Sequence, residues 1–388
     1  MKVGYFVETP VAHNLTGGVR SFLNLIEELL KLGVAPYVVT SEEWEFTDKL
    51  KELGVPYLAS KMLRPFVGTT STVRFQREKY WIKTIINNHT RDKATKWFKE
   101  NGVELVHINS QFAGIIGAQV AQKLKIPYVY HMREYLDRDF FVKFYSEKLV
   151  QKYIATAPKV IGISKSIQQY YEQKLRRDVT LVYNGIPVKN ENCFSPDVRL
   201  SKEQVELAIV GRVNPAKGQL EAVQALKFLK QEYGCTNVRL HIIGYMGKDP
   251  YEMQIKQYAE ENSILEQVVF HPFTNKPEEI LKDCDVGLTC SIAEAFGRVT
   301  VEYMLAGLLP VGADTGGTPE IILDGQTGLL YRQGDPEDLA KKLYWVLQNK
   351  EEARQMLRAG QKRGLDVFTI RATANNVWDI YTEIKLSR

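Results

Sequence analysis

The chain has 388 residues, of which 44% are hydrophobic and 25% are charged, the composition of an ordinary soluble globular protein. This length exceeds that of one typical hydrophobic core, so we expect two domains. No apolar stretch approaches about 18 residues, which argues against a membrane-spanning helix. The first residues run directly into a strand pattern, so we expect no secretory signal.

The four cysteines carry no sign of a metal or disulfide framework. None belongs to a C-x-x-C pair, and no histidine cluster lies beside any of them. This spacing argues against a zinc site and fits a reducing compartment. We therefore expect a cytoplasmic protein.

The net charge of +5 is unevenly distributed. Residues 61–100 carry ten lysines and arginines against three acidic residues, so this stretch alone, at +7, is more basic than the whole chain. Two interpretations stay open: a solvated basic helix face, or a surface that meets an anionic acceptor or the lipid head groups at the inner face of the membrane. No nucleic-acid-binding motif accompanies the aromatic residues there, so we expect no nucleic-acid partner.

Strand and helix patterns alternate from the start of the chain. We expect a strand at 3–7, a turn at Thr16-Gly17-Gly18, a helix at 19–32 and a strand at 36–39. The two glycines would let the backbone come close to a ligand at the carboxyl end of the first strand. The turn lacks G-x-G-x-x-G, which argues against a nicotinamide enzyme.

The rest of the first half continues this alternation. No clear pattern covers 61–80, for which we expect a loop. The elements expected next are a helix at 91–101, a strand at 103–108, a helix at 113–124, a strand at 127–130, a helix at 143–155, a strand at 160–163, a helix at 167–175 and a strand at 179–183. The polar stretch 184–201 is the expected linker between domains.

A polar cluster, His131-Met132-Arg133-Glu134-Tyr135, directly follows the strand at 127–130. Such a position lies at the carboxyl edge of a parallel sheet, where functional residues gather. Taken alone, His131 fits a turn histidine bonded to nearby backbone as well as it fits a site residue.

A second series begins near residue 206. The elements expected are strands at 206–210, 238–243, 268–270, 286–290, 309–313 and 329–331, with helices at 219–229, 250–261, 277–282, 336–348, 351–365 and 370–384. Two such series predict two doubly wound parallel sheets, an α/β protein with domains at 1–190 and 191–369 and the ligand in the cleft between them.

The stretch from Ser291 to Leu305 is the strongest candidate site in the second half. Glu294 and Glu302 stand eight positions apart, and a helix is expected to begin after Gly297, which lies between them. The first backbone N–H groups of that helix and its dipole would attract an anion. Carboxylates that hold hydroxyls beside amides that hold phosphates describe a nucleotide-sugar site, although such a spacing also arises by chance.

A basic loop at 211–218 supplies the complementary charge. Arg212 and Lys217 follow the first strand of the second series. Arg212 offers a planar, forked guanidinium and Lys217 a compact ammonium. Fixed cations there would hold a diphosphate and stabilise the charge that grows on it as a sugar leaves.

These features together resemble the family-4 retaining glycosyltransferases of the GT-B fold, across nearly the whole chain. The motifs that carry the resemblance are Thr16-Gly17-Gly18-Val19-Arg20, His131-Met132-Arg133-Glu134, Tyr183-Asn184-Gly185-Ile186, Val210-Gly211-Arg212 with Lys217-Gly218, the Glu294–Glu302 pair, Asp314-Thr315-Gly316-Gly317-Thr318-Pro319-Glu320 and Asp324-Gly325-Gln326-Thr327-Gly328. In this order the motifs are highly specific.

The resemblance implies a role for each matching position. The donor site would comprise Gly17, Gly18, Arg212, Lys217, Thr274, Glu294, Phe296, Gly297, Arg298, Val299 and Glu302. The catalytic set would be Glu294, Lys217, Arg212 and His131. Within these sets, Glu302 would bond the ribose, Glu294 the transferred sugar, and Thr274 would lie near the base. The last helix, at about 370–388, would cross back onto the first domain.

The resemblance also implies the chemistry. A nucleotide-diphosphate sugar, most simply a UDP-sugar, would donate to a glycan or lipid-linked acceptor with retention by a front-face route, in cell-surface polysaccharide or glycoconjugate biosynthesis. No general base, cofactor or metal is expected, and we assign no metal to the D-x-D spacings at 137–139 and 283–285. A nucleotide-sugar epimerase of the same architecture and a non-catalytic sugar-nucleotide-binding module are the alternatives.

Two positions depart from the family pattern. Arg298 stands where a small or aliphatic residue is frequent, and it would add a contact to donor or acceptor. Tyr303 replaces the usual small residue after the second glutamate, where it would repack the helix.

Overall fold

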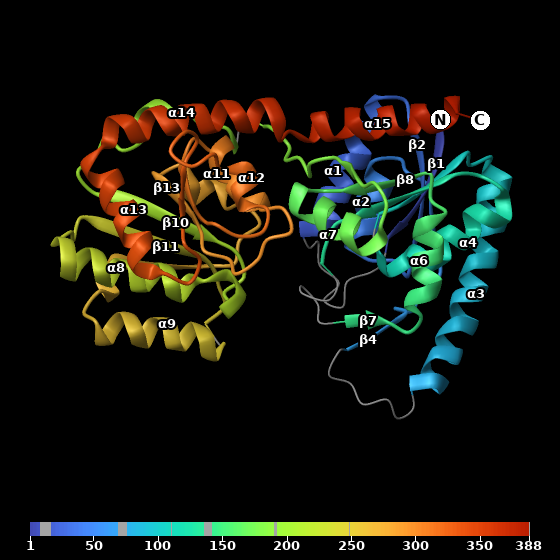
Figure 1. The fold of residues 1–388 in the computed structure, drawn as a ribbon, viewed down its shortest axis with the longest axis horizontal. Helices are drawn as coiled ribbons and strands as arrows, with labels where there is room; N and C mark the ends of the chain where they lie inside the picture. Colours follow the sequence, from blue (N-terminus) through green and yellow to red (C-terminus); the bar gives the residue numbers. More distant parts are fainter. Residues whose placement is uncertain are drawn as a thin grey trace. The chain divides into compact units, whose positions relative to one another are not determined.

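The computed structural model describes residues 1–7, 17–68, 76–109, 111–135, 142–189, 192–247 and 249–387 (Figure 1). The chain forms two compact units, which we describe separately. Unit 1 comprises Met1–Gly185 and Ile370–Arg388, and unit 2 comprises Ile186–Thr369. No helix among the described residues is long and apolar enough to cross a membrane.

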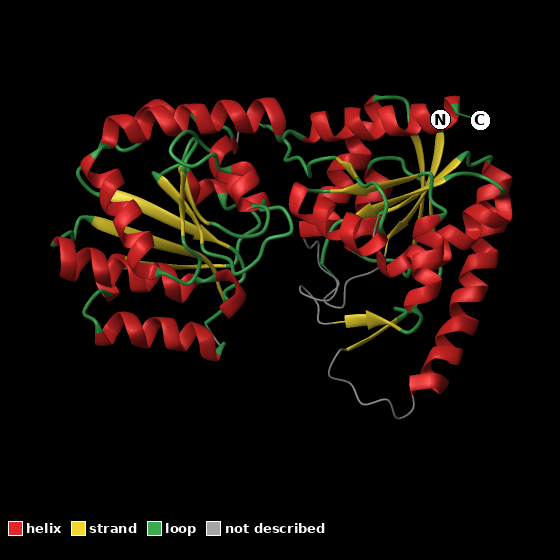
Figure 2. Cartoon of the chain, in the orientation of Figure 1, coloured by secondary structure: helices red, strands yellow, loops and turns green. Residues whose placement is uncertain are grey.

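Unit 1 is built on a seven-stranded parallel sheet in the order β3-β2-β1-β5-β6-β8-β9 (Figure 2). Its strands are β1 (Lys2–Val7), β2 (Ala35–Thr40), β3 (Tyr57–Ala59), β5 (Leu105–Ile108), β6 (Tyr128–Met132), β8 (Lys159–Gly162) and β9 (Thr180–Leu181). Its helices are α1 (Gly17–Lys31), α2 (Glu45–Glu52), α3 (Gln76–Asn101), α4 (Gly114–Leu124), α6 (Glu147–Ala155), α7 (Lys165–Leu175) and α15 (Ile370–Leu386), with a 3₁₀ turn at Gln111–Ala113. The central strands are buried apolar runs, as expected of a parallel sheet covered on both faces.

The last helix completes the core of unit 1. α15 lies beside α1 (Figure 1), and the two helices share one apolar cluster with β1. Val377 and Tyr381 of α15 are fully buried there, together with Phe22 of α1. The apolar face of α15 therefore belongs to unit 1, although about 185 residues of chain separate it from the rest of that unit.

Two expectations for unit 1 are wrong. β4 (Phe66–Gly68) and the start of α3 lie inside the stretch expected to be a loop, and α3 begins at Gln76 rather than near residue 91. The segment expected to begin a helix at residue 143 instead forms β7 (Val142–Phe144), which pairs antiparallel with β4. Each of these strands has only three residues, too few to show the alternation by which a strand is recognised.

Unit 2 contains a six-stranded parallel sheet in the order β12-β11-β10-β13-β14-β15 (Figure 2). Its strands are β10 (Val205–Val210), β11 (Val238–Tyr245), β12 (Val268–Pro272), β13 (Val286–Thr289), β14 (Leu309–Ala313) and β15 (Leu329–Tyr331). Its helices are α8 (Gln219–Tyr233), α9 (Pro250–Glu261), α10 (Glu278–Leu281), α11 (Arg298–Leu305), α12 (Thr318–Ile321), α13 (Pro336–Gln348) and α14 (Lys350–Val367), with 3₁₀ turns at Pro196–Val198, Pro215–Lys217 and Leu265–Gln267.

The end of the stretch expected as a linker packs onto unit 2. Arg199 is buried, and its Nη2 donates to the carbonyl of Ala306 at 2.9 Å. The backbone N–H of Leu200 donates to Oδ1 of Asp285 at 2.6 Å. Asp285, one member of the D-x-D spacing at 283–285, therefore has a structural hydrogen-bond partner in this segment.

Candidate functional site

Two loops meet at the carboxyl edge of the unit 2 sheet. β10 and β13 are adjacent and parallel, so the loops that follow them leave the sheet side by side. The backbone N–H of Ile292, after β13, donates to the carbonyl of Ala216, after β10, at 3.0 Å. The order of the strands in the sheet thus brings together two motifs that lie about 80 residues apart in sequence.

Lys217 and Glu294 form an ion pair across this junction. The ammonium of Lys217 contacts Oε1 of Glu294, and the two side chains are 36% and 19% exposed. The hydroxyl of Ser291 donates to the same carboxylate oxygen at 2.8 Å. Two residues implied to bind different parts of one ligand are therefore in direct contact in the ligand-free protein.

Glycines allow the backbones around Glu294 to approach closely. Gly218 has a φ of +70°, and a Cβ there would lie 2.1 Å from the carbonyl oxygen of Cys290. Gly316 has a φ of +58°, and its Cβ would lie 2.4 Å from the carbonyl oxygen of Glu294. The N–H of Gly317 donates to that oxygen at 2.7 Å. The Gly316-Gly317 motif thus fixes the backbone that carries Glu294.

Arg298 and Glu302 lie one turn apart on α11. Nη2 of Arg298 is 3.3 Å from Oε1 of Glu302, and the two side chains are 20% and 28% exposed. The helix begins at Arg298 after Gly297, whose φ of +101° and missing side chain leave the first turn without a side-chain cap. Arg298, expected to add a contact to donor or acceptor, is thus placed on the carboxylate implied to bind the ribose.

The remaining residues implied for the donor site differ in their surroundings. The Phe296 side chain is 3% exposed and packs edge-on against Phe368, so only its backbone can face a ligand. Val299 packs against a small apolar cluster. Arg212 is exposed, and among the described residues its guanidinium makes no hydrogen bond or ion pair. Thr274 follows the edge strand β12, and its hydroxyl accepts from the N–H of Lys276 at 3.0 Å, a local turn contact.

Tyr303 is a buried structural residue. Its hydroxyl accepts from the N–H of Val210 at 2.8 Å and donates to the carbonyl of Leu288 at 3.2 Å, so it links α11 to β10 and β13. A Cβ at Gly287 would lie 2.2 Å from Cγ of its ring. This departure from the family pattern is therefore matched by a glycine beneath the ring.

In unit 1, three of the sequence motifs are joined by hydrogen bonds. Nη1 of Arg133 donates to Oδ1 of Asn184 at 3.1 Å, and Nε of Arg133 donates to Oδ1 of Asn109 at 3.0 Å. Nδ2 of Asn184 donates to the hydroxyl of Ser21 at 3.2 Å, which in turn donates to the carbonyl of Gly17 at 2.9 Å. The start of α1, the end of β6 and the segment after β9 thus form one polar network.

His131 lies in the same network and is buried. Its Nδ1 is 3.1 Å from Nε2 of His107 and 3.4 Å from Nη2 of Arg133. Burial, and then the charge of Arg133, lower the pKa of His107 to about 3 and hold the pKa of His131 well below its usual value. Both imidazoles are therefore neutral at physiological pH.

Two residues of this network were not predicted from the sequence. His107 is a polar residue inside the buried run of β5, a signal that could have revealed it. Tyr381, whose hydroxyl lies 2.5 Å from Nδ1 of His107, sits in the apolar stripe of α15 and gives no such signal.

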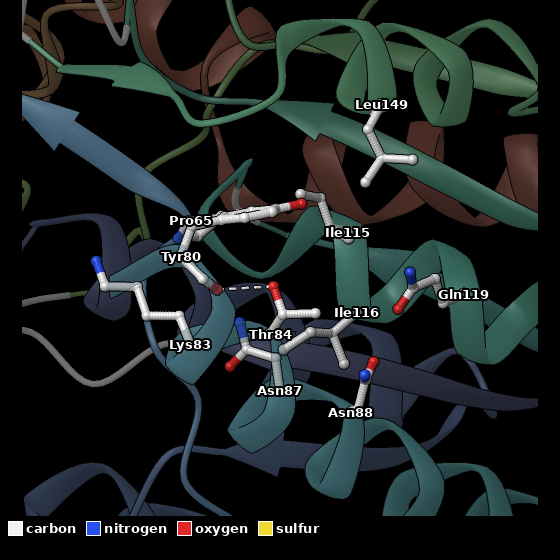
Figure 3. A pocket seen from close by; sticks show the side chains of 10 residues that line it. All are labelled: Pro65, Tyr80, Lys83, Thr84, Asn87, Asn88, Ile115, Ile116, Gln119 and Leu149. Atoms are coloured by element: carbon white, nitrogen blue, oxygen red, sulfur yellow. Dashed lines mark hydrogen bonds between the residues drawn. The ribbon is translucent and has the colours of Figure 1, made fainter. Parts of the chain in front are cut away.

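A separate pocket opens in unit 1 between α3, α4 and α6 (Figure 3). Its lining residues are Pro65, Tyr80, Lys83, Thr84, Asn87, Asn88, Ile115, Ile116, Gln119 and Leu149. Nζ of Lys83 donates to the carbonyl of Arg64 at 2.9 Å, and the amide of Asn87 bonds both backbone groups of Leu63. These hydrogen bonds hold the segment at 63–64, which precedes β4. Apolar side chains therefore make up most of the remaining surface of the pocket.

Three expected features lie outside the described residues: Thr16 of the first glycine motif, and Asp137 and Asp139 of one D-x-D spacing. Gly17 and Gly18 are described, begin α1 and are exposed. A Cβ at Gly18 would meet nothing within 4 Å, so packing does not require a glycine there. Within the described ranges no group of three or more His, Cys, Asp or Glu is arranged to hold a metal ion.

Comparison with solved structures defines the class of fold. HepE of Anabaena in complex with UDP superimposes with a TM-score of 0.79 at 19% identity, covering 99% of this chain and 100% of HepE. Sucrose-phosphate synthase from Thermosynechococcus elongatus superimposes with a TM-score of 0.76 at 18% identity, covering all of both chains. Two parallel-sheet α/β units with these likenesses are the GT-B fold of glycosyltransferases.

Sequence comparisons define the family. Residues 15–190 match the model for Glycosyltransferase Family 4, and residues 193–363 match the model for Glycosyl transferases group 1. An uncharacterized glycosyltransferase, MJ1178 of Methanocaldococcus jannaschii, is 24% identical over 74% of this chain and 77% of its own length. Alpha-maltose-1-phosphate synthase of Mycolicibacterium smegmatis is 32% identical over 53% of this chain and 55% of its own. The chain is a glycosyltransferase of the group 1, family 4 type.

Proposed function

We propose that this glycosyltransferase transfers a sugar from a nucleotide-diphosphate sugar, a UDP-sugar, to a glycan or lipid-linked acceptor with retention of anomeric configuration. The observation that carries the proposal is the junction of Lys217 with Glu294, because it sets a cation and a hydroxyl-binding carboxylate side by side at a sheet edge. HepE, whose fold this chain shares, has been solved with UDP and with UDP-glucose, which supports a uridine donor.

In the proposed donor site, different residues bind different parts of the nucleotide sugar. Arg212 and Lys217 hold the diphosphate, and the first N–H groups of α11, after Gly297, add to that cradle. Glu302, with Arg298 beside it, bonds the ribose, while Glu294 bonds hydroxyls of the sugar. We assign the base to the neighbourhood of Thr274. Gly17, Gly18 and His131 are the contributions proposed from unit 1.

Binding of the donor would exchange the partners of Lys217. In the ligand-free protein the ammonium is paired with Glu294. A diphosphate carries more negative charge than one carboxylate, so it competes for the ammonium and leaves Glu294 to accept from sugar hydroxyls. In the complex the ammonium would then face the diphosphate, and the carboxylate would accept hydrogen bonds from neutral hydroxyls.

The proposed reaction follows from these charges. As the bond from the anomeric carbon to the diphosphate breaks, negative charge grows on the leaving phosphate, where Arg212 and Lys217 stabilise it. The acceptor hydroxyl then bonds the anomeric carbon on the same face and passes its proton to a phosphate oxygen. No protein base and no metal is required by this route. Addition of EDTA should therefore leave the rate unchanged.

A thermal-shift panel of uridine, guanosine and adenosine diphosphate sugars tests the donor. We expect a UDP-sugar to raise the melting temperature most, and transfer assays with that donor and candidate glycan or lipid-linked acceptors then identify the product. Incubation with the donor alone separates the alternatives: an epimerised sugar nucleotide would indicate an epimerase. Binding without turnover on any acceptor would indicate a binding module.

We also propose that the protein works in cell-surface polysaccharide or glycoconjugate biosynthesis, in the cytoplasm, at the inner face of the membrane. Three large apolar side chains near the start of α3 are exposed: Trp81 at 67%, Ile82 at 58% and Ile85 at 65%. Helical spacing places them on the same side as the exposed Lys93, Lys96 and Lys99. Apolar residues that enter a bilayer beside lysines that meet its head groups fit an anionic lipid surface.

Two exposed acidic residues, Asp92 and Glu100, lie on this side of α3, and Glu100 pairs with Lys96 at 3.8 Å. Asp92 is exposed, but it pairs with Arg91 at 2.9 Å and with Lys123 of α4 at 2.6 Å. The two hydrogen bonds hold the pKa of Asp92 near 2. Asp92 is therefore ionised, but Lys93, Lys96 and Lys99 outnumber the two carboxylates, so this side of α3 keeps a net positive charge.

A further inference from the structure

A line of hydrogen bonds runs through the core of unit 1 and ends on a ring nitrogen to which no described residue bonds. The hydroxyl of Tyr5 lies 3.0 Å from that of Tyr381, which lies 2.5 Å from Nδ1 of His107. Nε2 of His107 lies 3.1 Å from Nδ1 of His131. All four side chains are at most 1% exposed. Nε2 of His131 is buried, and no described residue bonds to it.

The contact with Arg133 favours one direction for this line of hydrogen bonds. A guanidinium can only donate, so Nδ1 of His131, 3.4 Å from Nη2 of Arg133, must be an acceptor. Nε2 of His107 must then carry the proton that it donates to the same Nδ1. Because burial keeps His107 neutral, its Nδ1 is unprotonated and accepts from Tyr381. The hydroxyl of Tyr381 donates its single proton to His107. In its contact with Tyr5 it must therefore be the acceptor.

We propose that Tyr381 and His107 are positioning residues that hold His131 in the tautomer with its proton on Nε2, so that His131 offers an N–H donor to a ligand oxygen. The oxygen belongs to the nucleotide sugar, and to that extent the inference rests on the proposed function. A buried N–H without an acceptor is unfavourable, and a hydroxyl or phosphate oxygen would satisfy it.

This arrangement decides what His131 can do. With a proton on Nε2, that nitrogen has no lone pair and cannot take a proton from an acceptor hydroxyl. The ring is also too deeply buried to become an imidazolium at neutral pH. His131 is therefore a donor rather than a base, and the C-terminal helix, through Tyr381, acts with Arg133 to hold its tautomer.

Tyr381→Phe and Tyr5→Phe are a matched pair of variants. Each removes one hydroxyl from a fully buried tyrosine and keeps the ring. Only Tyr381→Phe removes the group that donates to His107, because in Tyr5→Phe the Tyr381 hydroxyl still makes that bond. In Tyr381→Phe, His107 loses the donor that keeps its own proton on Nε2, so only the 3.4 Å contact with Arg133 still opposes a proton on Nδ1 of His131.

Selective ¹⁵N-histidine labelling of the ligand-free full-length chain tests the proposal, since only six histidines contribute signals. The shifts of the two ring nitrogens distinguish the tautomers, and His131→Gln assigns the signal. We expect His131 with its proton on Nε2 in the wild type and in Tyr5→Phe, and mixed tautomers in Tyr381→Phe. A proton on Nδ1 in the wild type, or equal changes in both tyrosine variants, would overturn the proposal.

Activity gives a second readout. With the donor selected by the thermal-shift panel, Tyr381→Phe should lower kcat/KM roughly threefold to tenfold, the scale of one weakened hydrogen bond, and Tyr5→Phe should stay within about twofold. His131→Gln, whose amide can still donate at the far end, should retain more activity than His131→Ala. Equal losses in the two tyrosine variants would refute the positioning role. Absence of all transfer in the wild type would refute the proposed function and leave the tautomer result standing.

Discussion

Lys217 and Glu294 are 77 residues apart in the chain, yet the ammonium of one is paired with the carboxylate of the other at the edge of the unit 2 sheet. Neighbouring strands β10 and β13 bring them together. The pair neutralises both groups in the ligand-free protein and leaves Arg212, among the described residues of its loop, as an exposed cation without a partner. A diphosphate bound as we propose would therefore meet one available cation and one that must change partners.

Replacing Lys217 should weaken both binding and transfer. Lys217→Ala removes the cation that we propose stabilises the leaving diphosphate, so we expect transfer to fall roughly tenfold to a thousandfold. UDP affinity, measured by calorimetry, should fall as well. Lys256→Ala, which removes an exposed lysine on α9, is the control and should leave both unchanged. Normal transfer in Lys217→Ala would refute the diphosphate assignment.

Replacing Glu294 should separate binding from transfer. Glu294→Gln removes the charge that pairs with Lys217, so the ammonium no longer has to leave a carboxylate when UDP binds. We expect UDP to bind at least as tightly as to the wild type, while transfer falls roughly tenfold or more because the sugar loses a charged acceptor. Weaker UDP binding in this variant would contradict the proposed exchange of partners.

Arg298 and Glu302 can be separated by a double-mutant cycle. If Arg298 acts by orienting Glu302, then Arg298→Leu should raise KM for the donor roughly threefold to tenfold, and should cost nothing further in a Glu302→Gln background. Donor KM values for the two single variants and the double variant give the coupling. Additive effects would show instead that Arg298 contacts the ligand directly.

The sequence predicts the parallel sheets well and the contacts between motifs poorly. Buried strands such as β1 and β10 are short apolar runs with clear ends, so the α/β class and the GT-B fold are confirmed. The first half of α3 was missed because its exposed Trp81, Ile82 and Ile85 give no core-facing stripe. Local patterns cannot show which loops meet.

The same limit applies to the candidate site. The sequence proposes the two glutamates, Arg212 and Lys217 as site residues from residue type and position, but the Lys217–Glu294 pair depends on strand order, which a linear pattern does not contain. Tyr381 could not be found at all, because a tyrosine in the apolar stripe of a helix looks like any other core residue. Only the three-dimensional return of α15 onto unit 1 places its hydroxyl beside His107.

The buried histidines should make stability depend on pH. His107 has a pKa of about 3 in the folded protein against about 6.5 unfolded, so below pH 6.5 the unfolded chain binds a proton that the folded one does not. The free energy of unfolding should therefore fall as the pH drops, by about 1.4 kcal/mol per buried histidine between pH 7.5 and 5.5. Urea unfolding at both pH values measures this difference. His107→Gln should reduce it, whereas replacing the exposed His89 by Gln should not.

Tyr303 and Gly287 should matter for stability rather than for chemistry. Tyr303→Phe leaves the N–H of Val210 without its acceptor, which should lower the free energy of unfolding by about 1–3 kcal/mol. Gly287→Ala drives a methyl group into the Tyr303 ring and should cost a similar amount. Denaturant unfolding measures both. Transfer per folded molecule should stay near the wild-type rate, and a large loss of turnover in fully folded Tyr303→Phe would give this residue a role in the reaction.

The exposed side of α3 should bind anionic membranes through two distinguishable contributions. Trp81→Ser/Ile85→Ser removes apolar area, so we expect weaker sedimentation with phosphatidylglycerol vesicles at every salt concentration. Lys93→Glu/Lys96→Glu reverses charge on the same side, so its loss should be greatest at low salt and small at high salt. Neutral phosphatidylcholine vesicles are the control and should bind weakly to all forms. If both double variants sediment like the wild type, α3 is not the membrane-facing surface and its exposed tryptophan needs another partner.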